Sequence, residues 1–355
     1  MKDKKVYICL EDGSVFEGKR FGAEGDALGE LVFTTGMGGY METLTDKCNY
    51  GQIVMQTFPL IGNYGCIDED IQGKNSVLSA YIVREYCRHP SNFRCSRTLD
   101  EYLKEHNIVG VYDADTRELT KTLRNKGTVN AFITENPRSA DFDKIKAYRI
   151  TGAAKALSVT KPEMHPSDEH KFNVVLIDCG EKDSIISELN KLGCNVAVVP
   201  YNTKAQSILS LNPDGIVISN GAGDPADNAD VIAEIKELAG KQPIFAIGLG
   251  HQLLALSQGA ETYKMHHGHR GANQPVKDFE TDRTFITAQN HGYAVSSDSV
   301  AGTGGNISFS NVNDGSCEGI EYENINAFSV QFCPEACEDT KFIYKKFTDK
   351  MGGSR

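Results

Sequence analysis

An alternation of apolar strand-like segments with amphipathic helix-like segments constrains the second half of the chain more than any other feature. The strand-like segments are 172–180, 194–202, 214–225 and 242–250, and helical patterns lie between them. Nearly continuous apolar strands that alternate with helices are typical of a parallel sheet covered on both faces. The sequence therefore predicts a doubly wound, mainly parallel α/β domain over residues 172–355.

Two of the predicted strands end in glycine-rich turns, SNGAGDP at 219–225 and GLGHQ at 248–252. Ligands of parallel α/β sheets bind at the carboxyl ends of the strands, so these turns mark a candidate site. The second turn, in PIFAIGLGHQLLAL, has the pattern of a nucleophile elbow, which lifts one reactive side chain above the sheet. Its apex, however, is Gly248, which has no side chain.

The first 150 residues have a different pattern, in which short strand-like segments alternate with turns that contain glycine. Helical patterns follow around 91–106 and 115–127, and Asp115 or Thr116 is expected to cap the second helix. Residues 151–171 contain two prolines and no hydrophobic period, which predicts a linker. A chain of 355 residues has room for two domains, so an N-terminal mixed β/α domain is expected over 1–150.

Composition excludes several classes of function. A formal net charge of −11 without long Lys/Arg runs argues against a nucleic-acid partner. The N-terminus lacks the pattern of a signal peptide and no run of 18 apolar residues occurs, so neither a membrane partner nor export is expected and a cytoplasmic location is predicted. The ten cysteines form no Cys-x-x-Cys pair, and Cys333 and Cys337 are a poor zinc signature, so no metal site is expected.

Two further segments, TAQNHGY at 287–293 and QFCPEA at 331–336, complete an ordered set with the two glycine turns. Together these segments resemble the class I glutamine amidotransferases. In that family a cysteine at the elbow attacks the side-chain amide of glutamine, and a histidine in a His-Pro-Glu motif activates the cysteine. The glutamate of the motif orients the histidine.

A more specific resemblance spans both halves of the chain, and its N-terminal segments are the discriminating part. Three segments are similar to segments of the carbamoyl phosphate synthetase small-subunit family. They are GELVFTTGMGGYMETLTD at 29–46, NIVGVYDADTRELTKTLRNKG at 107–127 and HGHRGANQPVKD at 267–278. This resemblance implies a large-subunit partner that receives ammonia and makes carbamoyl phosphate for arginine or pyrimidine synthesis. It also implies that ATP and Mg²⁺ are bound by the large subunit, so no cofactor is expected in this chain, and that L-glutamine is a candidate ligand.

The sequence departs from the family at three positions. Gly248 stands where the family has its nucleophilic cysteine, and Cys333 stands where it has the basic histidine, although Glu335 is retained. Cys48 occupies the position of a serine that contacts glutamine in the family. A glycine cannot replace the attacking thiolate, so the resemblance predicts a chain without glutaminase activity.

Other positions match residues that cradle glutamine in the family. The resemblance implies that the backbone amides of Gly221 and Leu249 stabilise the oxyanion. The remaining matches are Gly223, Gln252, Asn290, Gly292 and Tyr293. A purely structural role is an alternative, because tight turns need glycine whether or not a ligand binds, and His251 and His291 then serve as supporting residues.

Three functions remain open from the sequence. The first is an inactive small subunit that docks on and stabilises an ammonia-using large subunit. The second is an active glutaminase in which Cys333 is the nucleophile and His291 or His251 is the base. The third is a binding module that senses glutamine without hydrolysing it.

Overall fold

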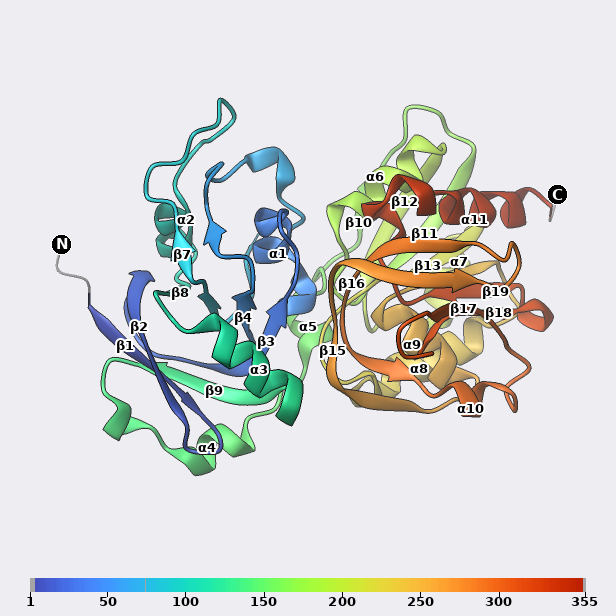
Figure 1. Ribbon diagram of the computed structural model, residues 1–355. Helices are drawn as coiled ribbons and strands as arrows, with labels where there is room; N and C mark the ends of the chain where they lie inside the picture. The colour runs from blue at the N-terminus through green and yellow to red at the C-terminus, as the bar shows by residue number, and fades with distance from the viewer. Residues whose placement is uncertain (1–3, 74, 354–355) are drawn as a thin grey trace. The chain divides into compact units, whose positions relative to one another are not determined.

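The computed structural model describes residues 4–73 and 75–353, and the chain divides into two compact units (Figure 1). The first unit comprises Met1–Ile150 and His266–Gly271, and the second comprises Thr151–Met265 and Ala272–Arg355. Each unit has its own hydrophobic core.

The first unit is built on a closed barrel with the strand order β1-β2-β8-β6-β4-β3-β9. Its strands are β1 (Lys5–Leu10), β2 (Val15–Gly22), β3 (Ala27–Thr34), β4 (Gln52–Gln56), β6 (Ala80–Ile82), β8 (Val109–Tyr112) and β9 (Val129–Thr134). A separate pair is formed by β5 (Leu60–Ile61) and β7 (Glu85–Tyr86). The helices are α1 (Tyr40–Thr45), α2 (Leu99–Glu105), α3 (Thr116–Lys126) and α4 (Phe142–Ala147), with 3-10 turns η1 (Lys47–Asn49), η2 (Asp68–Asp70) and η3 (Pro137–Ser139).

Alternation along the strands fills the interior of the barrel. Val6, Ile8 and Leu10 on β1 are all buried in one core cluster, as the period of two requires. Closure pairs both edges of the sheet, which leaves no free edge. The sequence predicted a mixed β/α domain but not this closure, because the alternation is the same in open and closed sheets.

The helix starts follow the expected capping chemistry. Asp115 Oδ1 accepts a hydrogen bond from Glu118 N at 3.0 Å, so of the two predicted caps Asp115 is the residue that caps α3. Thr98 and Glu101 form a capping box at the start of α2. The helical pattern predicted around 91–106 is helical only over α2.

The second unit contains a ten-stranded sheet with the order β10-β12-β11-β13-β14-β19-β18-β16-β15-β17. Its strands are β10 (Glu163–His165), β11 (Phe172–Asp178), β12 (Cys194–Pro200), β13 (Gly215–Ile218), β14 (Ile244–Ile247), β15 (Thr262–Asp278), β16 (Thr284–Val295), β17 (Asn306–Asn311), β18 (Cys317–Tyr322) and β19 (Ala327–Val330). The five strands from β12 to β19 in this order are parallel, whereas β18 pairs antiparallel to β19 and to β17. The antiparallel extension was not predicted.

Helices cover both faces of the parallel part, which confirms the predicted doubly wound α/β arrangement. The helices are α5 (Ala153–Leu157), α6 (Asp183–Lys191), α7 (Ala205–Ser210), α8 (Ala229–Leu238), α9 (Leu249–Ser257), α10 (Ser297–Val300) and α11 (Phe342–Gly352), with 3-10 turns η4 (Pro225–Asp227), η5 (Glu323–Ile325), η6 (Pro334–Ala336) and η7 (Glu338–Thr340). On β11, Val175 and Ile177 face the core under α7, α8 and α9, while Val174 and Leu176 face the core under α6 and α11.

The segment for which the sequence predicts a linker, 151–171, contains structure of its own. It forms α5 and then β10, which pairs antiparallel to β12 at the edge of the sheet. Val159 N donates to Asp178 Oδ2 at 2.6 Å, and Ser167 N donates to Asn195 Oδ1 at 2.9 Å. Elements this short carry too little periodicity to be recognised, and these contacts place the segment in the second unit.

Within the described residues, every helix is too short or too polar to cross a lipid bilayer.

Candidate functional site

The turn between β14 and α9 has the conformation of a nucleophile elbow. Gly248 adopts φ 59° and ψ −113°, a combination open to glycine and strained for any residue with a side chain. A Cβ atom at this position would lie 3.1 Å from Asn220 Cβ and 3.4 Å from Asn220 Cα. The strand, the apex and the following helix are therefore arranged as in an elbow, with hydrogen in place of the reactive side chain.

Two backbone amides beside the apex have no acceptor. Among the described residues, neither Gly221 N nor Leu249 N donates a hydrogen bond. The two residues are neighbours, because a Cβ atom on Gly221 would lie 2.7 Å from Leu249 Cδ2. Glycine at 221 is thus required by close packing, and the adjacent free N–H groups are the kind of donors that stabilise an oxyanion.

The side-chain amide nitrogen of Gln252 donates hydrogen bonds to other parts of the protein. Its Nε2 donates to Tyr293 O at 2.7 Å and to Gln331 Oε1 at 2.8 Å, which ties α9 to β16 and to the segment after β19. Within the described part of the chain, Gln252 Oε1 has no hydrogen-bond partner. Only this oxygen remains for a ligand.

His291 is held by protein groups at both ring nitrogens. Its Nδ1 lies 2.8 Å from Tyr293 O, and its Nε2 lies 2.9 Å from Gln289 Oε1. Tyr293 O is a backbone carbonyl and only accepts, so Nδ1 is the nitrogen that donates to it. Both ring nitrogens of His291 are therefore engaged by protein groups, and neither is directed at the elbow as a base.

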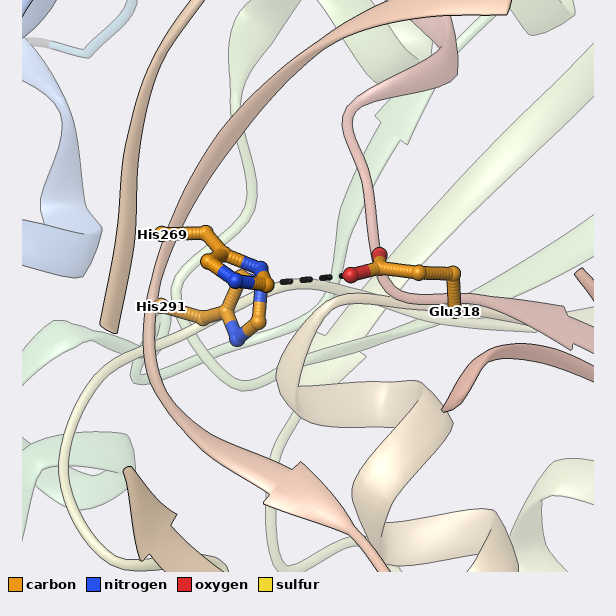
Figure 2. Close-up of side chains that lie close together, drawn as sticks. All are labelled: His269, His291 and Glu318. Atoms are coloured by element: carbon orange, nitrogen blue, oxygen red, sulfur yellow. Dashed lines mark ion pairs between the residues drawn. The ribbon is translucent and has the colours of Figure 1, made fainter. Parts of the chain in front are cut away.

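Glu318 determines how the Gln289 amide is oriented. Gln289 Nε2 donates to Glu318 Oε2 at 3.0 Å, so the opposite atom of the same amide, Oε1, faces His291. Figure 2 shows the carboxylate approaching His291, with Glu318 Oε1 4.0 Å from His291 Nε2. Glu318 is fully buried. The third side chain drawn there, His269, belongs to the segment that groups with the first unit.

His251 is neutral and enclosed. Its Nδ1 lies 2.8 Å from Ser329 Oγ, and its Nε2 is buried without a partner among the described residues. Burial lowers the pKa of His251 to about 3. A group with so low a pKa is a weak base, and no solvent reaches it because its side chain is fully buried.

Cys333 lies in a cluster of buried polar side chains after β19. Its backbone N donates to Ala288 O at 2.9 Å, which fixes the segment against β16. Lys182 Nζ lies 3.2 Å from Cys333 Sγ and 3.8 Å from Glu335 Oε1. Tyr344 OH donates to Glu335 Oε2 at 3.4 Å. Glu335, whose histidine partner in the family is replaced here by Cys333, is engaged by a lysine and a tyrosine.

The structure brings several of the predicted site residues together in the second unit. Gly221, Gly248 and Leu249 meet at the elbow, and Gln331 O would lie 4.0 Å from a Cβ at 248. Gly223 follows in the first glycine turn at φ 88°. The positions on β16 are Asn290, Gly292 and Tyr293. Cys48 lies in the first unit on η1, where its backbone N donates to Asp46 Oδ1 at 2.8 Å.

Sequence reasoning missed Lys182, Gln289 and Glu318. Lys182 lies in the turn between the carboxyl end of β11 and α6, so the topology of the parallel sheet could have identified it. Gln289 and Glu318 lie on the antiparallel strands β16 and β18, which carried no such signal.

The doubly wound sheet, the elbow and its free amides define a domain of the class I glutamine amidotransferase type. Residues 175–349 match the family model described as "Glutamine amidotransferase class-I". Residues 8–133 match the model described as "Carbamoyl-phosphate synthase small chain, CPSase domain".

Three curated relatives extend this similarity over the whole chain. The carbamoyl phosphate synthase small chain of Clostridium perfringens (strain 13 / Type A) is 46% identical over 348 residues, which cover 97% of this chain and 98% of the relative. The pyrimidine-specific small chain of Lactiplantibacillus plantarum is 44% identical over 354 residues, 99% of this chain and 97% of the relative. The small chain of Bacillus cereus (strain ATCC 14579) is 46% identical over 348 residues, 97% and 95% of the two chains. The chain belongs to the carbamoyl phosphate synthase small-chain family.

Proposed function

We propose that this family member lacks glutaminase activity, docks on a large synthetase subunit, and stabilises that subunit while it uses free ammonia. The observation that carries the proposal is the elbow apex, where Gly248 offers no nucleophile to a glutamine amide. In this proposal, ATP and Mg²⁺ belong to the large subunit, and the product serves arginine or pyrimidine synthesis. The ten free cysteines favour the reducing cytoplasm as its location.

The histidines of the second unit support the same conclusion. Both ring nitrogens of His291 are engaged by protein groups, and the pKa of His251 is about 3. The other two are His165, which lies on β10 3.9 Å from Glu163, and His170, which precedes β11 and lies 3.1 Å from Asn173 Oδ1. His170 lies near the amino end of β11, whereas the elbow follows the carboxyl end of β14, so none of the four is a free base at the elbow.

This geometry counts against an active glutaminase built on Cys333. The two histidines considered as its base, His251 and His291, are both engaged elsewhere. Lys182 contacts the sulfur directly, but a protonated lysine donates hydrogen bonds and accepts none. It therefore cannot act as the general base that activates the water needed to hydrolyse an acyl-enzyme.

Glutamine binding without hydrolysis is supported by a separate observation. The amides of Gly221 and Leu249 are free, and Gln252 Oε1 has no partner among the described residues. Titration calorimetry of the chain with L-glutamine tests this sensing role, with glutamate and D-glutamine as controls. A heat of binding for L-glutamine alone would support it, and no heat at millimolar ligand would refute it.

The docking role is tested by mixing the chain with a large subunit. A stable heterodimer interface buries at least about 1,000 Å², so the two chains should sediment as one species at micromolar concentration. Two independently sedimenting species would refute docking.

The catalytic proposal is tested on the same complex. We expect ammonia-dependent carbamoyl phosphate synthesis and no glutamate release from glutamine. Glutamate release above about 1% of a typical kcat near 10 s⁻¹ would refute the proposal. If Cys333→Ser abolished that release, Cys333 would be the nucleophile.

A further inference from the structure

The contact between Lys182 and Cys333 has no part in the proposed docking function, and its chemistry points to a different role. Lys182 lies between β11 and α6, and Cys333 lies between β19 and η6, so residues 151 positions apart meet. Lys182 is 8% exposed and Cys333 is 9% exposed. The distance of 3.2 Å from Nζ to Sγ is within hydrogen-bonding range for sulfur.

The donor in this contact must be the lysine. An ammonium group has three N–H donors and no lone pair, so the sulfur is the acceptor. A thiolate accepts far better than a thiol, and an adjacent cation stabilises the thiolate form. The contact therefore favours ionised Cys333 in a place where burial alone would oppose it.

Charged and titratable groups from several elements lie near the Lys182–Cys333 pair. From η6, Glu335 Oε1 lies 3.8 Å from Lys182 Nζ, farther than the sulfur. From α11, Tyr344 donates to Glu335 Oε2, and burial raises the pKa of Tyr344 so that it stays neutral. Glu188 on α6 adds a more distant negative charge, and Ala288 O on β16 accepts a hydrogen bond from Cys333 N. The lysine thus has a carboxylate and a sulfur as neighbours.

Three other buried cysteines show how burial shifts the pKa of a thiol. Burial raises the pKa of Cys66, Cys194 and Cys317 to about 12. All three are fully buried, whereas Cys333 keeps 9% of its surface exposed. These thiols are therefore protonated and enclosed at neutral pH, and they serve as internal references.

We infer that Cys333 is a modification site, a thiolate paired with the Lys182 ammonium that reacts with small uncharged electrophiles such as hydrogen peroxide. The sulfur attacks one peroxide oxygen, so that an S–O bond forms and the O–O bond breaks. The sulfur is oxidised by two electrons to sulfenic acid, and the departing hydroxide takes a proton and becomes water. Peroxide is the oxidant, and Lys182 stays a cation throughout. The inference is independent of whether the chain hydrolyses glutamine.

Alkylation measured cysteine by cysteine tests the thiolate. The full chain is pulsed with iodoacetamide between about pH 5.5 and 9.5, and each labelled peptide is quantified by mass spectrometry. We expect the labelling rate of Cys333 to reach half its maximum at or below about pH 7.5, whereas an ordinary thiol does so near pH 8.5. Cys194 and Cys317 should stay unlabelled, and Cys337 provides a partly exposed comparison.

Lys182→Met and Glu335→Gln should shift the labelling of Cys333 in opposite directions, which separates an effect of charge from an effect of loosened packing. Lys182→Met should raise the pH of half-maximal labelling by at least about one unit and slow labelling at pH 7 about tenfold, and Lys182→Arg should restore the parent profile. Glu335→Gln removes a negative charge and should lower that pH. Loosened packing would instead speed labelling in both variants. Lys191→Met, on the exposed end of α6, is the matched control and should change nothing.

The reaction with peroxide is measured by trapping the sulfenic acid that it forms. The chain is treated with hydrogen peroxide in the presence of dimedone, which forms a stable adduct with sulfenic acid. We expect the adduct on Cys333 in the parent chain, and its loss in Lys182→Met. The inference is overturned if Cys333 follows the pH profile of Cys337, or if Cys333 is not labelled in the folded chain at any pH. It is also overturned if Lys182→Met and Glu335→Gln shift the pH of half-maximal labelling in the same direction, or if peroxide leaves no dimedone adduct on Cys333.

Discussion

Restoring a thiol and an imidazole at the elbow tests whether the rest of the glutamine site is intact. The change is Gly248→Cys combined with Cys333→His. Gly248→Cys alone supplies a thiol without a base, and Cys333→His alone supplies a base without a nucleophile. Because the two groups act as one unit, we expect both single variants to be inactive and the double variant to release glutamate at least about tenfold faster than either.

The structure sets the cost in stability of placing a side chain at 248. Gly248 has φ 59° and ψ −113°, and a residue strained in this way costs about 1–3 kcal/mol. Its Cβ would also lie 3.1 Å from Asn220 Cβ, so Asn220 must move by a few tenths of an ångström. Gly152 is the matched control, because it has φ 64° and ψ 23°, a Cβ added there would have no atom within 4 Å, and it lies in the same unit.

Urea unfolding followed by circular dichroism measures this cost. In the left-handed region an alanine costs about 1–2 kcal/mol, so Gly152→Ala should lower the free energy of unfolding by about that amount. Gly248→Ala should lower it by about 1 kcal/mol more, since it adds the close contact and the rarer ψ. Equal losses for the two variants would show that the elbow is not strained.

The activity assay follows glutamate release by the parent, both single variants, the double variant and a triple variant that adds Cys48→Ser. The large subunit is present throughout. The resemblance places Cys48 where the family contacts substrate, so the triple variant should mainly have a lower KM. A folded double variant no faster than the singles would contradict the reasoning, and the ligand roles of Gln252, Asn290, Gly292 and Tyr293 would have to be withdrawn.

Two further predictions concern stability. Burial lowers the pKa of His251 to about 3, whereas in the unfolded chain it titrates near 6.5, so the unfolded state binds more protons between these values. The free energy of unfolding should therefore fall as the pH drops from about 6.5 towards 3, by up to about 1.4 kcal/mol per pH unit. His251→Gln should flatten this slope in urea titrations. An unchanged slope would contradict the assignment. Asp115→Ala removes the cap of α3 and should cost about 1 kcal/mol of unfolding free energy, with Asp115→Asn close to the parent; an equal loss in both would show that the cap hydrogen bond is not responsible.

Local features of the fold could be predicted from the sequence. The alternation from Phe172 onwards identified the strands and helices around the parallel sheet, because burial on both faces leaves few polar positions in a strand. The cap of α3 was narrowed to Asp115 or Thr116 because capping depends on residues within one turn, and the structure shows that it is Asp115. The conformation of Gly248 followed from a strand, a short turn and a helix in direct succession.

Features that depend on distant residues were not visible in the sequence. The closed barrel of the first unit requires the two end strands, β1 and β9, to pair, and the alternation of either strand is compatible with an open sheet. The linker expected at 151–171 instead adds β10 to the edge of the second sheet. Both outcomes depend on which backbone groups find a partner once the sheets assemble.

The sequence by itself determined the parallel α/β half, the elbow with its empty apex, and the family through the segments of both domains. Tertiary structure alone decided which side chains become neighbours at the site. Glu318, on another strand, orients the Gln289 amide that contacts His291, and Cys333 meets Lys182 across 151 residues. Protonation depends on the charges and acceptors within a few ångströms, and those neighbours are set by the packing of strands and helices that are far apart in the sequence.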